Sequence, residues 1–220
     1  MMSNVTSQLL QIYDALMAHY GPQGWWPADS TTETIIGTIL VQHTAWKNVE
    51  RAIANLKAEN LLDFRALHDL DPATLAKIIQ PAGTPTVKAR RLQAFAAWLG
   101  TRHGFVLDSM SSTPQNVLRR ELLAIKGIGP ETADCILLYA AQQPAFVVDT
   151  YTGCVLSRHL LADSDSGYDR LKGLFEANLP RDVRLFNEFH ALLVEVGKKH
   201  CRKAPVCAGC PLEHLEHTVE

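Results

Sequence analysis

The chain has 220 residues, of which 47% are hydrophobic and 20% charged, an ordinary globular composition that can form one large core or two smaller ones. No run of 18 apolar residues is present and the start lacks the basic-then-apolar order of a signal peptide, so we expect a cytoplasmic protein without a membrane span. The odd number of cysteines, five, excludes complete disulfide pairing, and the net charge of −2 argues against a strongly basic nucleic-acid binder.

Helical periodicity runs through nearly the whole chain. It begins with apolar residues at three- and four-residue spacing between Leu9 and Tyr20. A loop rich in glycine and proline follows at 21–29. Ser30 and Glu33 then have the spacing of a capping box, which predicts the start of the next helix.

Proline residues mark two further helix starts. Asp71-Pro72 and Thr113-Pro114 each predict an N-cap followed by proline at the first helical position. Other helices are predicted at 46–57, 87–102, 114–124, 130–142, 149–161, 167–178 and 182–197. Only 145–148 has a strand-like pattern, and it is too short to build a sheet. The predicted fold class is therefore all-α.

The most informative stretch is Leu-Ala-Ile-Lys-Gly-Ile-Gly-Pro-Glu-Thr-Ala-Asp at 123–134. One predicted helix ends at the turn that contains Gly127 and Gly129, and another begins at once with Pro130. Glycines allow a large partner to approach the backbone closely. The new helix presents unpaired N–H groups and the positive end of its dipole. Such a turn suits a phosphate group, although a tight corner between two helices has the same pattern.

Asp149 follows the apolar run 146–148 and opens a predicted helix, 18 residues after Glu131. Taken alone, a carboxylate at this position is typical of an N-cap. A hairpin turn followed at this spacing by Val-Asp-Thr is much rarer. Here the chain resembles the endonuclease III family, the helix-hairpin-helix (HhH-GPD) DNA glycosylases, and the resemblance covers nearly its entire length.

The resemblance implies base-excision repair of a damaged base that is flipped out of double-stranded DNA, with Asp149 as the catalytic residue. A carboxylate stabilises the positive charge that develops on the sugar, and it can orient or deprotonate the attacking water. Relatives that also nick the strand place a lysine nucleophile where this chain has Glu131. The resemblance therefore implies a hydrolase without AP-lyase activity. Its DNA phosphate-binding residues would be Lys126, Gly127, Ile128 and Gly129.

The segment 39–46 is similar to a family segment that reads Leu-Thr-Gln-Asn-Thr. Gln42 matches the glutamine that enters the DNA stack as the target base leaves, which offsets part of the cost of unstacking. The chain departs from the family at His43, where asparagine is usual.

An aromatic loop indicates which base is removed. Tryptophans in a Gly/Pro loop are most often core residues. Trp25-Trp26-Pro27 with Trp46, however, resembles the 3-methyladenine DNA glycosylase III branch, which also has a glutamate at the position of Glu131. We expect these residues to form the base pocket and to stack a cationic alkylated purine such as 3-methyladenine. Mismatched thymine and oxidised pyrimidines are the alternatives.

Three cysteines near the C-terminus have the spacing of metal ligands: Cys201, Cys207 and Cys210. They resemble the iron–sulfur loop of endonuclease III relatives, in which four thiolates hold a [4Fe–4S] cluster. The fourth cysteine is missing, and three residues could replace it: His214, Glu216 and His217. The alternatives are a cluster with a non-cysteine fourth ligand, a zinc ion, or a loop without metal.

The resemblance also implies two helical lobes with the hairpin and Asp149 at the cleft between them. Residues 28–140 would form a six-helix domain, and residues 1–27 with 141–220 a discontinuous second lobe that ends in the cysteine loop. We expect a nucleoid-associated monomer whose partner is damaged double-stranded DNA. A non-catalytic DNA-binding module is the alternative from another class, but simple binding needs neither Asp149 nor the aromatic loop.

Overall fold

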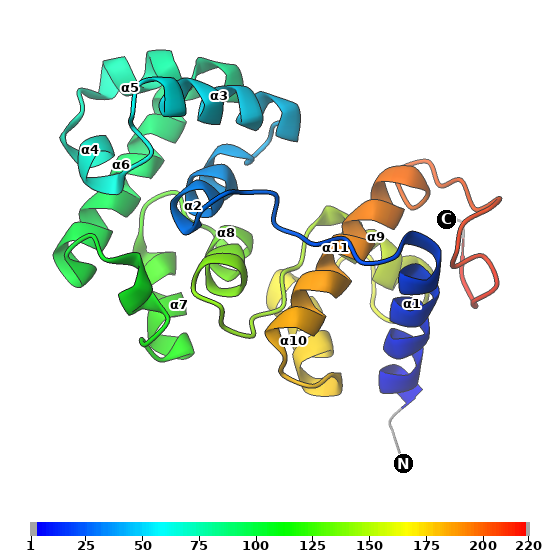
Figure 1. The fold of residues 1–220 in the computed structure, drawn as a ribbon. Helices are drawn as coiled ribbons and strands as arrows, with labels where there is room; N and C mark the ends of the chain where they lie inside the picture. Colours follow the sequence, from blue (N-terminus) through cyan, green and yellow to red (C-terminus); the bar gives the residue numbers. More distant parts are fainter. Residues whose placement is uncertain (1–3, 219–220) are drawn as a thin grey trace. The chain divides into compact units, whose positions relative to one another are not determined.

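The computed structural model describes residues 4–218, and every regular element in that range is helical (Figure 1). The all-α prediction is therefore confirmed. The chain separates into two compact units, one of residues 26–143 and one that combines the residues up to 25 with those from 144 onward. Within the described range, no helix has both the length and the apolar composition that crossing a bilayer requires.

The unit of residues 26–143 is built around α2 (Thr31–Leu40), which is buried on almost every face. Its buried residues include Glu33, Thr34 and Thr38 besides the apolar ones, because neighbouring elements cover it. These neighbours are α3 (Trp46–Ala58), α6 (Pro85–His103), α8 (Pro130–Cys135) and the π-helical turn η3 (Ile136–Ala140). Ser30 caps α2 by accepting a hydrogen bond from the Glu33 backbone at 3.2 Å, which confirms the predicted cap.

Shorter helices complete this unit: α4 (Phe64–Asp69), α5 (Pro72–Ile78), η1 (Gln80–Ala82), η2 (Leu107–Met110) and α7 (Gln115–Ala124). Asp71 caps α5 through the Thr74 backbone at 2.8 Å, as predicted. The cap predicted at Thr113 is wrong, because Pro114 occupies the N-cap position of α7 and the Thr113 hydroxyl donates to the Ser109 carbonyl. Helix α4 was not predicted, since six residues are too few to show helical periodicity.

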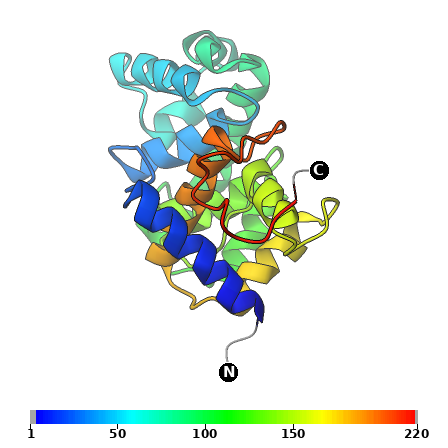
Figure 2. The same ribbon diagram turned by 90° about the vertical axis from the view of Figure 1, so that its right-hand side faces the viewer.

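The other unit contains α1 (Asn4–Tyr20), α9 (Thr150–Arg158), α10 (Tyr168–Asn178) and α11 (Val183–Lys199). Helix α1 lies beside α11 in both ribbon views (Figures 1 and 2). The strand-like run at 145–148 is irregular backbone with buried side chains. Its Phe146 stacks on Phe175 with ring centroids 3.7 Å apart, so this apolar run belongs to the core of the unit.

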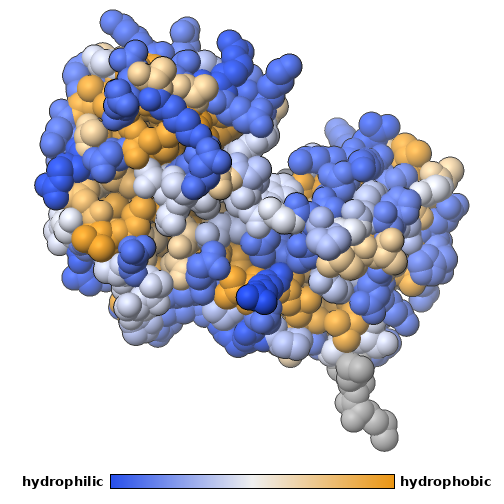
Figure 3. Space-filling view, in the orientation of Figure 1, coloured by the Kyte–Doolittle hydropathy of each residue, from blue (hydrophilic) through white to orange (hydrophobic). Residues whose placement is uncertain are grey.

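Polar and apolar side chains are distributed over the surface of each unit as in ordinary globular proteins. On the face drawn in Figure 3, hydrophilic side chains cover much of each unit and apolar side chains form smaller patches between them. Large apolar residues that remain exposed are Val87, Val106, Leu123, Leu160 and Val206. Single exposed apolar residues of this kind are normal in globular proteins.

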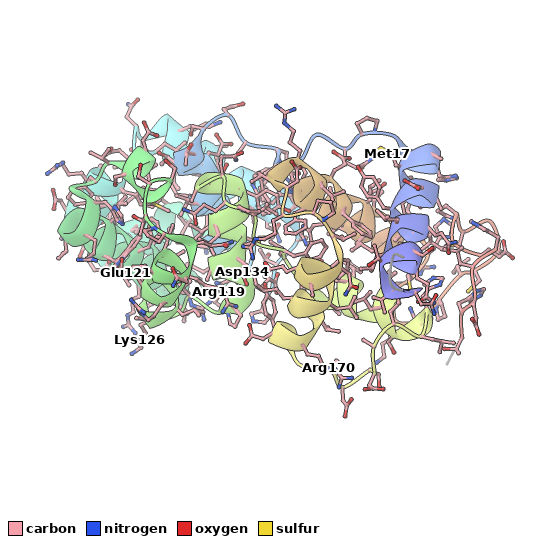
Figure 4. All side chains as sticks on the ribbon, turned by 90° about the horizontal axis from the view of Figure 1, so that it is seen from below. Met17, Arg119, Glu121, Lys126, Asp134 and Arg170 are labelled. Atoms are coloured by element: carbon pink, nitrogen blue, oxygen red, sulfur yellow. The ribbon has the colours of Figure 1, made fainter. Side chains whose placement is uncertain are left out.

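A buried ion pair joins the two helices of the Gly-x-Gly hairpin. Arg119 on α7 contacts Asp134 on α8 through two hydrogen bonds of 2.9 and 3.1 Å, and the two side chains meet in Figure 4. The Asp134 side chain is 0% exposed and that of Arg119 23%. Two parallel hydrogen bonds fix the orientation of both groups, so this pair sets the angle between α7 and α8.

Asp134→Ala should destabilise the protein by about 3 kcal/mol, because it leaves the Arg119 guanidinium without its carboxylate partner in a largely buried setting. Urea denaturation followed by circular dichroism measures the loss. The matched control is Glu121→Ala, which removes the partner of the exposed Arg102 and should cost less than about 1 kcal/mol. Equal losses in the two variants would contradict a structural role for the buried pair.

Candidate functional site

Asp149 is the N-cap of α9, and its two carboxylate oxygens have different surroundings. Oδ1 accepts hydrogen bonds from the Thr152 backbone N–H at 2.8 Å and from the Thr152 hydroxyl at 2.9 Å. Oδ2 lies 4.0 Å from Nε2 of His190. The side chain of Asp149 is 16% exposed. Oδ1 therefore caps helix α9, and Oδ2 faces the buried imidazole of His190.

His190 lies on α11 and was not identified from the sequence. Its side chain is 5% exposed. Burial lowers the pKa of His190, the carboxylate of Asp149 opposes this shift, and the ammonium of Lys198 adds to it. The imidazole is therefore neutral near pH 7. The sequence contains one indication of its buried position, since this histidine lies on the apolar face of the predicted helix 182–197.

A glycine allows the helices that carry these two residues to approach closely. A β-carbon at Gly197 would lie 2.4 Å from the ring of Tyr151, a distance that real β-carbons do not reach. Tyr151 is in the first turn of α9, two residues after Asp149, and Gly197 is in the last turns of α11. The contact between α9 and α11 is therefore matched in shape at this position, and it places Asp149 within reach of His190.

Trp25 and Lys198 extend the same group of side chains. The Trp25 and His190 rings have centroids 6.0 Å apart, and Nζ of Lys198 lies 5.3 Å from the centroid of the Trp25 ring. A lysine at this distance from an indole makes a cation–π interaction of roughly 0.5–2 kcal/mol. Asp149, His190, Trp25 and Lys198 all belong to one unit and form what we call the Asp149 group.

In the other unit, the Gly-x-Gly turn lies between α7 and α8. Gly127 has φ +93°, a value that favours glycine, and a β-carbon there would lie 2.5 Å from the side chain of Arg91. Ile128 is buried, and its N–H donates to the Ile125 carbonyl at 3.0 Å. Lys126 is exposed at the edge of the unit (Figure 4), and Gly129 is the N-cap of α8. Ile128 was predicted to bind a phosphate. Its side chain is instead buried in the protein, and its N–H is hydrogen-bonded to a backbone carbonyl of the same turn.

Gln42, the predicted wedge, is bonded to this turn. Its Nε2 donates to the Thr132 hydroxyl at 2.8 Å and to the Gly127 carbonyl at 3.3 Å, and its Oε1 accepts from the guanidinium of Arg91. Sequence reasoning missed this role of Arg91. The adjacent His43 is exposed with φ +55°, a left-handed conformation that histidine adopts more readily than most residues.

The predicted aromatic residues are divided between the two units. Trp26 packs edge-on against Trp46 with centroids 5.3 Å apart, and it also contacts Tyr139 at 5.1 Å. A β-carbon at Gly37 would lie 3.2 Å from Trp46 and 3.6 Å from Trp26, so both indoles pack closely over α2. Trp25, the neighbour of Trp26 in the chain, belongs to the Asp149 group of the other unit. Pro27 is exposed, and Glu131 is exposed in the first turn of α8.

The three cysteines of the C-terminal loop line one small cavity together with three histidines: Cys201, Cys207, Cys210, His159, His200 and His217. Burial raises the pKa of the Cys201 and Cys210 thiols, and Cys201 accepts a hydrogen bond from Arg158 at 3.1 Å.

Thiols and imidazoles are donors that suit iron–sulfur clusters and zinc. Of the three proposed fourth ligands, His217 reaches the cavity, whereas His214 and Glu216 are exposed. Among residues 4–218, no three His, Cys, Asp or Glu side chains converge closely enough to hold a metal ion. The donors as placed in the described residues do not complete a metal site.

Comparisons with known proteins identify the family. Residues 36–181 match the family described as HhH-GPD superfamily base excision DNA repair protein. Over 98% of both chains, the sequence is 43% identical to a Methanocaldococcus jannaschii protein named "Putative DNA repair glycosylase MJ1434".

Two solved structures share the fold. The 3-methyladenine DNA glycosylase MagIII of H. pylori, bound to 1,N6-ethenoadenine, has a TM-score of 0.77 at 24% identity and covers 90% of this chain and 98% of its own. A trapped endonuclease III–DNA covalent intermediate has a TM-score of 0.82 at 21% identity and covers 98% of this chain and 96% of its own. A protein of Sulfolobus acidocaldarius named "Endonuclease III" is 30% identical over 80% of this chain and 77% of its own. The chain belongs to the HhH-GPD superfamily of base excision DNA repair proteins and is a DNA repair glycosylase of the endonuclease III-like family.

Proposed function

We propose that the protein is a monofunctional DNA glycosylase that hydrolyses the N-glycosidic bond of a damaged base, with Asp149 as its catalytic residue. The observation that carries this proposal is that the two oxygens of the Asp149 carboxylate have different partners. Oδ1 is fixed by two hydrogen bonds from Thr152, so the orientation of Oδ2 is set before any substrate binds. Preorganised charge of this kind is the main way in which enzymes stabilise a developing charge.

In the proposed reaction the C1′–N bond breaks, its electron pair leaves with the base, and the sugar acquires oxocarbenium character. The negative charge of Asp149 opposes this positive charge, and the partly buried setting strengthens the interaction because water screens it less. Water then adds to C1′, and Oδ2 accepts a proton from it. The products are a free base and an intact strand with an abasic site.

Lys126 and the backbone of Gly127 and Gly129 are proposed to bind a DNA phosphate at the start of α8. Lys126 and both glycines are exposed, and the positive end of the helix dipole favours an anion at this position. Gln42 is the proposed wedge. It has to exchange its hydrogen bonds with Arg91 and Thr132 for contacts with DNA bases, and these bonds hold it beside the hairpin in the DNA-free protein.

The residue at the position of the lyase lysine supports a hydrolytic mechanism. Glu131 is exposed in the first turn of α8. A carboxylate cannot form a Schiff base with the sugar, so no covalent intermediate is available there to promote strand cleavage. We therefore propose that the enzyme lacks AP-lyase activity.

The proposed substrate is a duplex that carries an alkylated purine such as 3-methyladenine. The aromatic loop and Glu131 resemble the 3-methyladenine DNA glycosylase III branch, and the MagIII structure shares the fold. A methylated purine carries positive charge, which electron-rich indole rings attract and which weakens the glycosidic bond. Trp25, Trp26 and Trp46 are the proposed pocket residues, together with Pro27 and Glu131.

A second candidate substrate is favoured by Lys198. Its ammonium lies 5.3 Å from the centroid of the Trp25 ring, so a cationic base that stacks on Trp25 meets a like charge. A neutral base with carbonyl oxygens instead accepts a hydrogen bond from a lysine. Mismatched thymine and oxidised pyrimidines have such oxygens, and they form the competing class of substrate.

Base release from duplexes that carry 3-methyladenine, a T:G mismatch or thymine glycol tests the proposal. We expect release from one of them, and Asp149→Asn should lower the single-turnover rate by about 10²–10³-fold because it removes the negative charge. DNA affinity should remain, since asparagine caps helices as well as aspartate does. The matched control is Asp182→Asn, the same change at the N-cap of α11, which should retain full activity. Undiminished release by Asp149→Asn would remove this residue from the mechanism.

Borohydride trapping on a duplex with an abasic site tests the hydrolytic mechanism. Wild-type protein should give no covalent adduct, because Glu131 offers no amine to the sugar. Glu131→Lys restores an amine at that position and should give a trapped adduct, which also shows that the duplex is bound in register. A strong adduct with wild-type protein, lost in Lys126→Ala, would establish a lysine nucleophile and contradict the proposal.

A further inference from the structure

We infer that His190 is a positioning residue for this reaction: its imidazole directs an N–H at Oδ2 of Asp149 and keeps that oxygen oriented. The inference rests on the proposed function, because it assigns a task within the same reaction. It concerns a residue that lies 41 positions after Asp149, on a different helix.

The geometry identifies Oδ2 as the oxygen on which His190 acts. Oδ1 already accepts two hydrogen bonds from Thr152, whereas Oδ2 lies 4.0 Å from Nε2 of His190. A hydrogen bond needs an approach about 1 Å closer than this distance. Hydrogen bonds in active sites are often long in the free enzyme and shorten when substrate binds.

The charge state of His190 suits this task. The charged groups that act on the imidazole are Asp149, at the cap of α9, and Lys198, on the same helix as His190. The Trp25 ring covers it from the loop before α2. Burial and Lys198 both favour the neutral form. A neutral imidazole donates to the carboxylate without cancelling its charge, whereas an imidazolium would neutralise the charge that has to stabilise the sugar cation.

The packing around His190 holds it in place. Its side chain is 5% exposed, and its helix approaches α9 closely where Gly197 lies against Tyr151. A buried ring with fixed neighbours loses little further freedom in the transition state, so its N–H remains directed at Oδ2 throughout the reaction. A histidine that only filled space would need no polar atom turned toward the carboxylate of Asp149.

The test compares His190→Leu, which removes the N–H, with His190→Gln, whose Nε2 can take the place of the imidazole Nε2. Single-turnover base release is measured from pH 5 to 8, on the duplex that wild-type protein cleaves. We expect His190→Leu to be at least about tenfold slower.

His190→Gln should recover most of the rate, and the Kd for the duplex should be the same in all three proteins. The control is His103→Gln, which replaces a partly buried histidine of the other unit and should behave as wild type. Equal rates in wild type, His190→Leu and His190→Gln would overturn the inference. Equal defects in the two variants would also overturn it, since they indicate packing alone.

Nitrogen NMR of the imidazole is a second test of the inference, and it needs neither enzymatic activity nor the His190→Leu variant. In wild-type protein at pH 7 we expect a neutral His190 ring with the proton on Nε2, and Asp149→Asn should perturb that nitrogen. A ring that carries no proton on Nε2 would overturn the inference. A wild-type protein that releases no base, with the expected NMR signature, would contradict the proposed function and leave the contact between His190 and Asp149 established.

Discussion

The first turn of α9 needs a hydrogen-bond acceptor, and Asp149 supplies it with a single carboxylate oxygen. This bond fixes the direction of the second oxygen, so the cap of the helix is also what orients the proposed catalytic group. The orientation depends in turn on how α9 and α11 meet, since Gly197 has to lie under Tyr151 for His190 to face Asp149. In this unit one hydrogen bond and one close helix contact together orient the proposed catalytic group.

A second set of contacts defines the hairpin unit. Arg119 and Asp134 fix the angle between α7 and α8, while Arg91 packs under Gly127 and bonds to Gln42. The turn that is proposed to bind a phosphate is therefore supported from both helices and from α6. Gln42 is part of the same network, so the proposed wedge and phosphate site share a partner in Arg91. A change at Arg91 should consequently affect both, although the residue need not touch DNA.

Features that depend on residues close together in the chain could be predicted from the sequence. Capping residues such as Ser30 and Asp71 gave correct helix starts, and the hairpin with Asp149 identified the family. The predicted helix 130–142 was not resolved into α8 and the π-helical η3, because periodicity does not distinguish these two forms. Trp25 and Trp26 are adjacent yet belong to different units, and His190 meets Asp149 across 41 residues. Tertiary packing decides such contacts, and no local pattern encodes them.

We propose that the enzyme releases a base and leaves the strand intact. A single-turnover reaction on a labelled damaged duplex tests this proposal, with the products divided before electrophoresis into a neutral half and an alkali-treated half. We expect strand breaks in the alkali-treated half alone, because hydrolysis leaves an alkali-labile abasic site. Strand breaks of equal extent in the neutral half would show lyase chemistry and rule out a purely hydrolytic mechanism.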